Sequence, residues 1–438
     1  MTYSSGNYSC IASIGDTVLS DSIFIQLTEY NYGYKEVLSC SAVQSPSGIQ
    51  TWTTSGVYED TVSFSGGCDS VYIVNVFIDN RSIYYVDTTG LDTNDGSQQN
   101  PLRNIQTAIN RACEGDTVLV MNGTYYENLV ISEKNVFLTS YHLMSNDSLD
   151  IENTILNGGA NGLATIDIHS HQITSSVING FKITNGHNSN WLGGGISINN
   201  LNHLASVTLT NLIITDNQAQ GRGGGIGMSG AGNIFLKNSI IKENSANWHG
   251  AAIYNHGSYL TVENSIFLNH SNWLIHSDVG TCNFTNSIFS NDGPIALGFD
   301  ISFFNSTFYY SNKETSTPWT ISFYLGGAMV NCIVSNSYSI DTNHDVLFLN
   351  NHFEDSSSFA LLSNYEMLIG MNTTVFGPVT LNDPNNLDYS LANQSVSIGG
   401  GTNSLPPTSG NLTPLIVPNL DFFGNSRPNP TGSNPDIG

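Results

Sequence analysis

Basic residues are scarce in this chain, and their scarcity excludes several kinds of partner. Its 438 residues include 11 Lys plus Arg against 35 Asp plus Glu, which gives a formal net charge of -24 at pH 7. Such a charge repels phosphate backbones and anionic lipid surfaces, so we predict neither a nucleic-acid partner nor direct membrane insertion. Charged residues make up only 11% of the chain, while neutral Asn, Ser, Thr and Gly are abundant. A surface of neutral hydrogen-bonding groups suits sugars.

Long apolar runs and closely paired cysteines are missing as well. No apolar stretch has transmembrane length, and none of the six cysteines shows the Cys-x-x-Cys spacing of zinc or thioredoxin-like redox sites. Residues 1–10 lack the basic start and the apolar stretch of a secretion signal. We therefore expect either a missing leader or an excised part of a larger exported protein, with further domains missing at both ends.

A short phrase built around Asn-Ser-Ile returns along the chain. Its central asparagines follow one another at steps of 27, 26, 22, 19 and 26 residues: Asn211, Asn238, Asn264, Asn286, Asn305 and Asn331. A variable period of this length is typical of a solenoid in which each repeat forms one rung. Apolar and polar residues alternate within a rung, as in a strand with one buried face. We predict stacked parallel strands between about Val118 and Leu391, with amide hydrogen bonds along the asparagine column.

The residues before the repeats predict a strand, a loop, a helix and another strand. Tyr84-Tyr-Val-Asp87 is followed by Ile105-Gln-Thr-Ala-Ile109 at helical spacing and by Gly115-Asp-Thr-Val-Leu-Val120. This order resembles the opening cap of right-handed parallel β-helix proteins of the pectate-lyase-like group. The resemblance implies an all-β fold, a right-handed parallel β-helix (solenoid) with an N-terminal capping helix, preceded by a small β module. Such a helix would cover the unpaired strand edge at the open end.

We predict four segments along the chain. Residues 1–28 contain Tyr8 and Cys10, a Tyr-x-Cys pattern that resembles the end of an immunoglobulin-like domain. Residues 29–80 form a small disulfide-bridged β module, residues 81–386 the β-helix, and residues 387–438 a C-terminal closing segment. The closing segment resembles the end of secreted bacterial β-helix proteins that carry anchoring signals.

A disulfide is predicted within the small module. Cys40 and Cys68 share a segment whose core is too small to be stable alone, so we pair them, at a gain of about 3–4 kcal/mol in the chain-entropy model. The module resembles Cys-bridged spacers in secreted multidomain proteins of Bacteroidetes-type bacteria. Because disulfides persist in oxidising compartments, we expect a secreted or extracellular cell-surface protein.

Three tryptophans occupy similar places, each after a rung and before the next strand. They are Trp191, Trp248 and Trp273, and the coil between the first two carries Arg222 at that place. With the coils in register, the rings would form an aromatic track on which pyranose rings stack, with His249 beside it. Arg222 would contact a sugar hydroxyl or the carboxylate of an acidic sugar. The alternative is that the tryptophans only cover a corner of the solenoid.

Histidines are enriched in the repeats, but no motif assigns them a role. His169 and His171 are two residues apart on one predicted strand face, and four more lie near the tryptophans: His249, His256, His270 and His276. Neighbouring coils could join two histidines with Asp278 or Asp216 as metal ligands or acid-base groups. Hydrogen-bonded corner histidines are the simpler explanation.

Polysaccharide cleavage would need groups that the sequence supplies sparsely. Elimination from uronic polysaccharides needs a base and neutralising cations, and Lys and Arg are few in the repeats, so a lyase would depend on calcium or histidine. Hydrolysis needs two close carboxylates, and the chain has no Asp-Asp pair. The remaining candidates are Asp216, Glu243, Glu263 and Asp278, and the catalytic residues stay unassigned.

The segment Asp92-Thr-Asn-Asp-Gly96 is rich in oxygen ligands. Asp92, Asn94 and Asp95 resemble part of a calcium loop, but the downstream Glu of an EF-hand is missing, so an Asx-turn is the competing explanation. The sequence requires no cofactor, and calcium is the one candidate.

These observations predict an exported cell-surface or secreted protein that presents a β-helix face for carbohydrate binding or adhesion. The partner would be a polysaccharide or a cell-surface glycan. The alternative is a polysaccharide lyase or glycoside hydrolase acting on an extracellular polysaccharide. A third hypothesis is that the protein is an inert stalk. Because this fold hosts both enzymes and binders, the fold alone does not choose between them.

Overall fold

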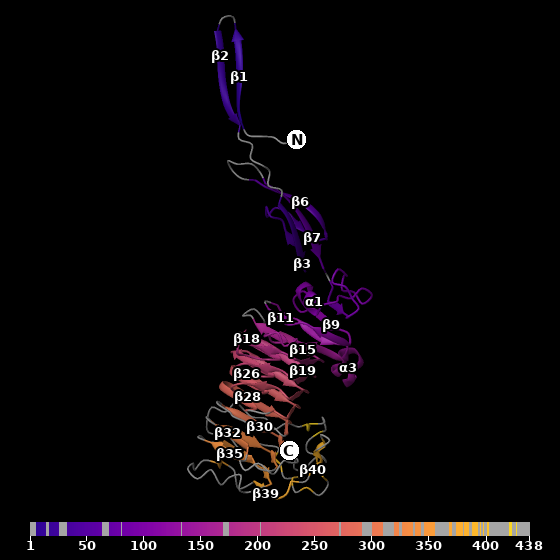
Figure 1. The fold of residues 1–438 in the computed structure, drawn as a ribbon, viewed down its shortest axis with the longest axis vertical. Coiled ribbons are helices and arrows are strands. Elements are labelled where there is room, and N and C mark those ends of the chain that lie inside the picture. The colour runs from indigo at the N-terminus through magenta and orange to yellow at the C-terminus, as the bar shows by residue number, and fades with distance from the viewer. Residues whose placement is uncertain are drawn as a thin grey trace. The chain divides into compact units, whose positions relative to one another are not determined.

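The computed structural model divides the chain into two compact units, Met1–Arg81 and Ser82–Gly438. It describes residues 6–14, 17–25, 33–63, 70–79, 81–132, 134–169, 175–201, 203–270, 273–290, 300–309, 319–323, 326–335, 338–342, 346–354, 368–369, 374–379, 381–384, 388–392, 395, 397, 401–402, 420–422 and 426. Strands dominate both units (Figure 1). Within these residues, no helix has the length and the apolarity that crossing a membrane requires.

The first unit consists of short sheets. Strands β1 (Gly6–Ile14) and β2 (Thr17–Ile25) form an antiparallel hairpin, and β4 (Val43–Gln44) pairs with β5 (Thr51–Trp52) in the same way. A three-stranded sheet has the order β3 (Gly33–Ser39), β7 (Ser70–Ile78) and β6 (Gly56–Val62). Its small core contains Trp52, which stacks on Tyr58 with ring centroids 4.7 Å apart, and the buried Val74 and Val76.

The predicted pairing of Cys40 with Cys68 stays a prediction. Cys40 and Cys113 are each disulfide-bonded, and Cys68 lies outside the described residues. A disulfide needs the close approach of two Cβ atoms in the fold, which closeness in sequence does not guarantee.

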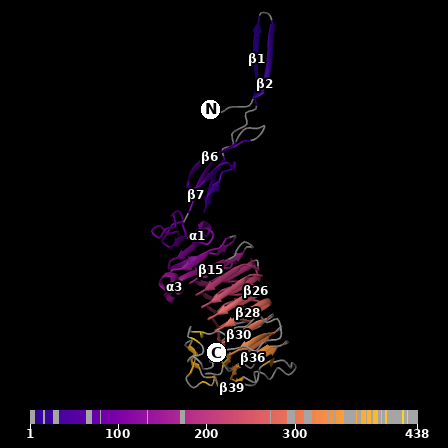
Figure 2. The same ribbon diagram turned by 180° about the vertical axis from the view of Figure 1, so that it is seen from behind.

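The second unit is a right-handed parallel β-helix, as predicted. One sheet contains the rung phrases in parallel order: β10 (Gly123–Tyr126), β13 (Thr154–Asn157), β16 (Lys182–Thr184), β20 (Ile213–Thr215), β24 (Ile240–Lys242), β27 (Ile266–Leu268), β29 (Ile288–Ser290), β31 (Thr307–Tyr309), β34 (Ile333–Val334), β37 (His352–Phe353) and β39 (Val375–Phe376). Successive strands of this sheet come from successive coils, and Figure 2 shows the stack of coils. Right-handed crossovers are the rule for parallel connections.

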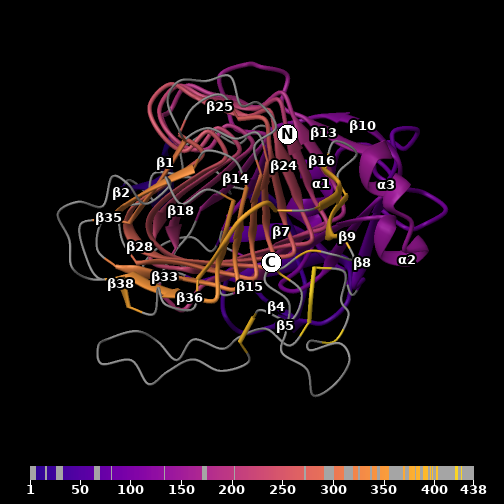
Figure 3. The same ribbon diagram turned by 90° about the horizontal axis from the view of Figure 1, so that it is seen from below.

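A larger sheet contains two rows of parallel strands. The first row is β8 (Ile83–Val86), β9 (Thr117–Val120), β12 (Phe137–Ser140), β15 (Ser175–Asn179), β19 (Ser206–Thr210), β23 (Asn233–Lys237), β26 (Ile253–Glu263), β28 (Ile275–Thr285), β30 (Ile301–Phe304), β33 (Gly327–Val330), β36 (Val346–Leu349) and β38 (Leu368–Ile369). The second row is β11 (Leu129–Ile131), β14 (Ile166–His169), β18 (Ile196–Leu201) and β22 (Ile226–Gly230), and it joins the first at the long strand β26. Figure 3 shows β18, β15 and β24 on different sides of the coil.

Short elements complete the unit. The strands β17 (His187–Asn188), β21 (Gln218–Ala219) and β25 (Ser245–Ala246) form a third parallel sheet, β32 (Trp319–Phe323) pairs with β35 (Tyr338–Thr342), and β40 (Leu381–Asp383) pairs with β41 (Asp388–Leu391). The described helices are α1 (Ile105–Arg111), α2 (His142–Ser145) and α3 (Ser148–Asn153).

Helix α1 provides the predicted cap. It buries Ile105, Ala108 and Ile109 against the first strands. The carboxylate of Glu127 accepts hydrogen bonds from the backbone N–H groups of Ile105 (2.8 Å) and Gln106 (2.9 Å), so it satisfies two donors at the helix start. The capping helix is therefore tied to the coil that it covers.

The core is a stack of inward side chains from the rung phrases. Phe267, Phe289 and Phe308 lie on neighbouring coils in register, with ring centroids 4.9 and 4.8 Å apart. All three rings are fully buried. The alternation in the sequence therefore predicted which residues face inward.

The asparagines of the phrases form the predicted column, which we call the asparagine ladder. Asn264, Asn286, Asn305 and Asn331 each donate their side-chain amide to the side-chain oxygen of the preceding asparagine, at 3.1–3.3 Å. All adopt a left-handed backbone, with φ between 48° and 54°. Asn tolerates this region better than other residues with a side chain. The ladder therefore has a structural role.

Candidate functional site

The outer face of strands β14, β18, β22, β26 and β28 carries the polar residues of the candidate site. Strand pairing aligns two outward rows across the coils: Asp167, Ser197, Gly227, Tyr254 and His276 in one, and His169, Asn199, Ser229 and His256 in the other. The intervening side chains, such as Ile168 and Ile198, are buried in the core. Because strand neighbours are about 4.8 Å apart, residues far apart in sequence form one surface.

The predicted tryptophan corner borders this face. Parallel bridges align Leu192 with Arg222 and Arg222 with His249, so the residues just before them, Trp191, Gly221 and Trp248, stack in successive coils. The rings of Trp191 and Trp248 meet edge to face, with centroids 4.7 Å apart. They meet across the intervening coil because Gly221 has no side chain there.

Backbone geometry at this corner is tight. A Cβ atom on Gly221 would lie 2.4 Å from the carbonyl oxygen of Trp191. Trp191 itself has a φ of 77°, which is rare for a bulky side chain. Strain of this kind is concentrated at functional sites.

The tryptophan rings remain at the surface. Trp191 is 56% exposed, Trp248 48% and Trp273 36%. The ring of Trp273 approaches that of His249, with centroids 6.0 Å apart. The coil that leads to Trp273 is shorter than the two before it, so the third tryptophan falls in a different register.

Arg222 lies at the centre of a polar network. Its guanidinium is 5.6 Å from the centroid of the Trp248 ring and 4.9 Å from that of the Tyr254 ring. One of its nitrogens, Nη1, donates to a carboxylate oxygen of Asp278 at 2.9 Å and also to the Tyr254 hydroxyl. Tyr254 in turn donates to Asp278, and His276 contacts the other oxygen of the same carboxylate through Nε2. Cation-π contacts and hydrogen bonds together hold the arginine in one place.

The network shifts the pKa values of Asp278 and Tyr254. Burial alone would raise the pKa of Asp278, but hydrogen bonds from Tyr254 and His276 and the charge of Arg222 bring it below its usual value. Burial and the bond to Asp278 raise the pKa of Tyr254 to about 12. Arg222, Asp278 and Tyr254 together therefore have no net charge near pH 7.

His249 stacks on His276, with ring centroids 4.5 Å apart. Burial and the neighbouring His276 and Arg222 lower the pKa of His249, so its ring is neutral at pH 7. The Nδ1 atoms of both rings and Nε of Arg222 are buried and have no hydrogen-bond partner among the described residues. Buried polar atoms of this kind are rare and indicate a place where a ligand or water completes the bonding.

Arg222 and Tyr254 of this network, together with the two tryptophans, line a pocket of about 430 Å³, which we call the aromatic pocket. Its lining includes Trp191, Leu192, Arg222, Trp248, Tyr254 and His256. The volume lies within the usual range for small-ligand sites. Sequence reasoning named both tryptophans and the arginine but missed Tyr254, whose only signal is an outward position on the strand after Trp248.

Other predicted candidates lie elsewhere. Asp216 and Glu243 follow β20 and β24 on the rung sheet, and Glu263 forms an ion pair with Lys237 at 2.9 Å. His169 contacts Asp167 at 3.1 Å, His270 is buried, and His171 lies outside the described residues. Only Asp278 of the four carboxylate candidates is in the network at the aromatic pocket.

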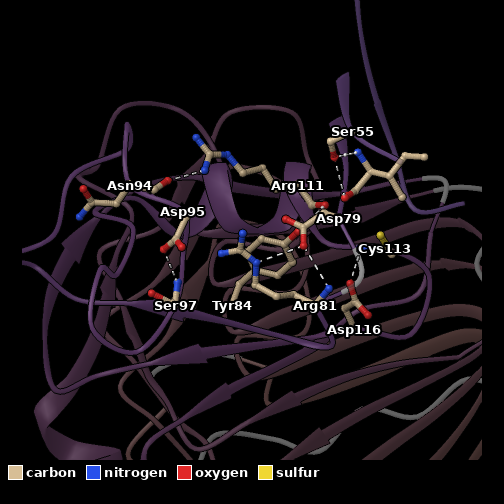
Figure 4. A network of polar contacts seen from close by, with 11 residues as sticks. Ser55, Asp79, Arg81, Tyr84, Asn94, Asp95, Ser97, Arg111, Cys113 and Asp116 are labelled. Carbon is tan, nitrogen blue, oxygen red and sulfur yellow. Dashed lines mark hydrogen bonds and ion pairs between the residues drawn. The ribbon is translucent and has the colours of Figure 1, made fainter. Parts of the chain in front are cut away.

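The predicted calcium residues are held by the chain itself. The Asp92 carboxylate accepts hydrogen bonds from the backbone of Arg103 and Asn104, and Asp95 accepts one from the backbone of Ser97. Arg111 donates to the carbonyl oxygens of Asp92 and Asn94, each at 2.6 Å, and Figure 4 shows the bond to Asn94. A guanidinium therefore occupies oxygens that a cation would need. Among the described residues, no three His, Cys, Asp or Glu side chains gather as metal ligands.

Comparisons with known proteins identify no family for this chain. Residues 88–137 match a family model described only as a protein of unknown function, DUF1565. No curated protein matches the chain. Similar solved structures include the pectin methylesterase PemA from Erwinia chrysanthemi (12% identity, TM-score 0.37, 74% of this chain and 98% of that one) and the pectate lyase Pel9A (14% identity, TM-score 0.42, 82% and 96%). These similarities are too distant to transfer an activity.

Proposed function

We propose that this protein binds a glycan at the aromatic pocket of its β-helix. The observation that carries the proposal is the pair of exposed rings, Trp191 and Trp248, held edge to face beside Arg222 and Tyr254. A tryptophan face offers the apolar, polarisable surface on which a pyranose ring stacks, and hydroxyl and guanidinium groups beside it suit sugar hydroxyls. Tryptophans that only cover a corner would be buried, whereas about half of the surface of each of these two residues is exposed.

The charge of the pocket favours a neutral glycan. Arg222 already pairs with Asp278, so its charge is cancelled before any ligand arrives. An acidic sugar would bring a second carboxylate to a cluster without net charge, in a chain whose formal charge is -24. Neutral sugars avoid this repulsion and still use the hydrogen-bonding groups.

Glycan-array binding tests the proposal. Wild-type protein should retain neutral glycans, and Trp248→Ala should weaken the retained signal about five- to thirtyfold, because a lost aromatic anchor costs about 1–2 kcal/mol. The matched control is Tyr126→Ala, which removes a 75% exposed ring from β10, outside the pocket. An array without hits, or equal losses in both variants, would contradict a binding role for the corner.

A second candidate function is cleavage of a polysaccharide. The observation that favours it is the Tyr254–Asp278–His276 network, which places a proton donor, a carboxylate and an imidazole beside a sugar-sized pocket. A hydrolase with two carboxylates receives less support. Another carboxylate on the outer face, Asp167, lies on β14. It is four strand spacings, or about 19 Å, from β28, which carries His276 and Asp278, whereas paired carboxylates lie within about 10 Å.

Incubation with plant and marine polysaccharides, with and without calcium, decides between binding and cleavage. New reducing or unsaturated ends that disappear in Asp278→Asn would establish an enzyme. No turnover across the panel, combined with array binding, would leave a binding protein. If the protein neither binds glycans on the array nor cleaves any polysaccharide, the inert-stalk hypothesis remains.

We also propose that the protein works outside the cell, as a secreted or cell-surface adhesin. The disulfide bonding of Cys40 and of Cys113 supports this because such bonds persist in oxidising compartments. Mass spectrometry of peptides from the unreduced protein tests whether these cysteines are disulfide-bonded. Finding both cysteines as free thiols in protein from its native source would remove this argument for an extracellular location.

A further inference from the structure

A second pocket lies next to the aromatic pocket on the same face. It has a volume of about 300 Å³ and shares Leu192 with the aromatic pocket. Its polar lining includes Asp167, Asn188, Asn190, Ser197 and Asn199, and we call it the polar pocket. The shared residue makes the two pockets neighbours along one surface.

The polar pocket is a connected set of hydrogen-bonding groups. Asn199 donates its amide to the Asp167 carboxylate at 3.2 Å and to the Ser197 hydroxyl at 2.9 Å. A carboxylate, an amide and a hydroxyl within one pocket match the paired donors and acceptors of neighbouring sugar hydroxyls. The lining residues include no Lys or Arg, and Asp167 would repel a uronate.

The two pockets extend across five strands. Leu129 and Val130 of β11 line the polar pocket, and Tyr254 and His256 of β26 line the aromatic pocket, with β14, β18 and β22 between them. Four strand spacings of about 4.8 Å give a surface about 19 Å long. One unit of an extended pyranose chain is similar in length to one strand spacing.

We infer that the two pockets together bind one linear, neutral oligosaccharide of about four sugars that runs across the strands. Its one end stacks at Trp191 and Trp248, and its other end bonds to Asp167, Ser197 and Asn199. This inference rests on the proposed glycan-binding function and adds the length, the charge and the direction of the ligand. The aromatic pocket supplies most of the affinity, and the polar pocket supplies the preference for longer chains.

Calorimetric titration with neutral gluco-, manno-, xylo- and galacto-oligosaccharides of two to six units tests the inference. For the series that binds, wild-type affinity should rise up to about four units and then level off. Asn199→Ala should lower the affinity for the four-unit ligand about three- to tenfold, as expected for lost hydrogen bonds, and leave that for the two-unit ligand unchanged. Trp248→Ala should weaken every length. Ser197→Ala, which removes one hydroxyl, serves if Asn199→Ala fails to fold.

The outcomes separate this inference from the proposed function. Two outcomes would contradict ligand binding at the polar pocket while leaving binding at the aromatic pocket intact. One is an affinity that is already constant from two units upward, and the other is an equal loss of affinity for short and long ligands in Asn199→Ala and Ser197→Ala. Tighter binding of oligogalacturonates than of every neutral series would overturn the neutral class. No binding of any series would overturn both.

Discussion

The asparagine ladder and the tryptophan corner belong to the same β-helix but have different roles. In the ladder, each coil repeats one residue type, and the amides bond to each other inside the protein. At the corner, successive coils carry Trp191, then Gly221 and Arg222, then Trp248 and His249, and the tryptophan rings remain half exposed. Repetition with internal bonding indicates stability, whereas variation with exposed aromatic rings indicates recognition.

The first way to break this comparison is Asn305→Ala in the ladder. Asn305 is buried, has a φ of 48°, donates to Asn286 and accepts from Asn331. Alanine would lose both bonds and strain the backbone, so we expect a loss of about 2–4 kcal/mol in the free energy of unfolding and unchanged glycan affinity. Urea titration measures it. The matched control Asn305→Gly, which tolerates this φ, should lose about 1 kcal/mol less.

Gly221→Ala tests the corner from its backbone. The new Cβ would meet the Trp191 carbonyl oxygen at 2.4 Å and push the coils or the ring pair apart. We expect about 1–3 kcal/mol of lost stability and about a fivefold to tenfold loss of glycan affinity. The control Gly56→Ala, whose Cβ would find its first contact at 3.4 Å, should change neither. Normal binding by Gly221→Ala would show that the tryptophan contact is dispensable.

Asp278→Asn tests the charge argument. Removing the carboxylate leaves Arg222 without its ion pair, so affinity for acidic glycans should rise about three- to tenfold and fall again with added salt. Array binding at two salt concentrations measures it. Asp216→Asn removes an exposed carboxylate on another sheet and should have no such effect. An unchanged preference in Asp278→Asn would show that Arg222 does not control charge selection.

The smallest expected effect is on pH stability. Because the folded-state pKa of Asp278 is depressed, its contribution is complete above the unfolded-state pKa of about 3.9 and is lost as the pH falls through the lower folded-state value. The Tm of wild type should therefore exceed that of Asp278→Asn slightly at pH 7, and the two should converge well below pH 4. A difference that persists in strong acid would come from packing instead.

Much of the fold was predictable because it is local and repeated. The asparagine spacing and the alternation around it placed Phe267, Phe289 and Phe308 in the core and the asparagines in a ladder. The helix at Ile105 was predictable from its apolar spacing, and the structure confirms it. Such signals act within one coil and need no knowledge of its neighbours.

The candidate site was only partly predictable because it depends on register between coils of different length. Arg222, Tyr254 and Asp278 lie on successive coils, so their contacts depend on how the coils stack. The sequence near Tyr254 does not indicate these contacts. The shift of Trp273 toward His249 has the same origin.

The most direct measurement is a calorimetric titration of the strongest neutral array glycan into wild type and into the double variant Trp191→Ala and Trp248→Ala. We predict that the wild type binds, and that the double variant loses detectable binding while its Tm stays within a few degrees of wild type, because both rings are half exposed. Equal affinity in the two proteins would contradict glycan binding at the tryptophan corner.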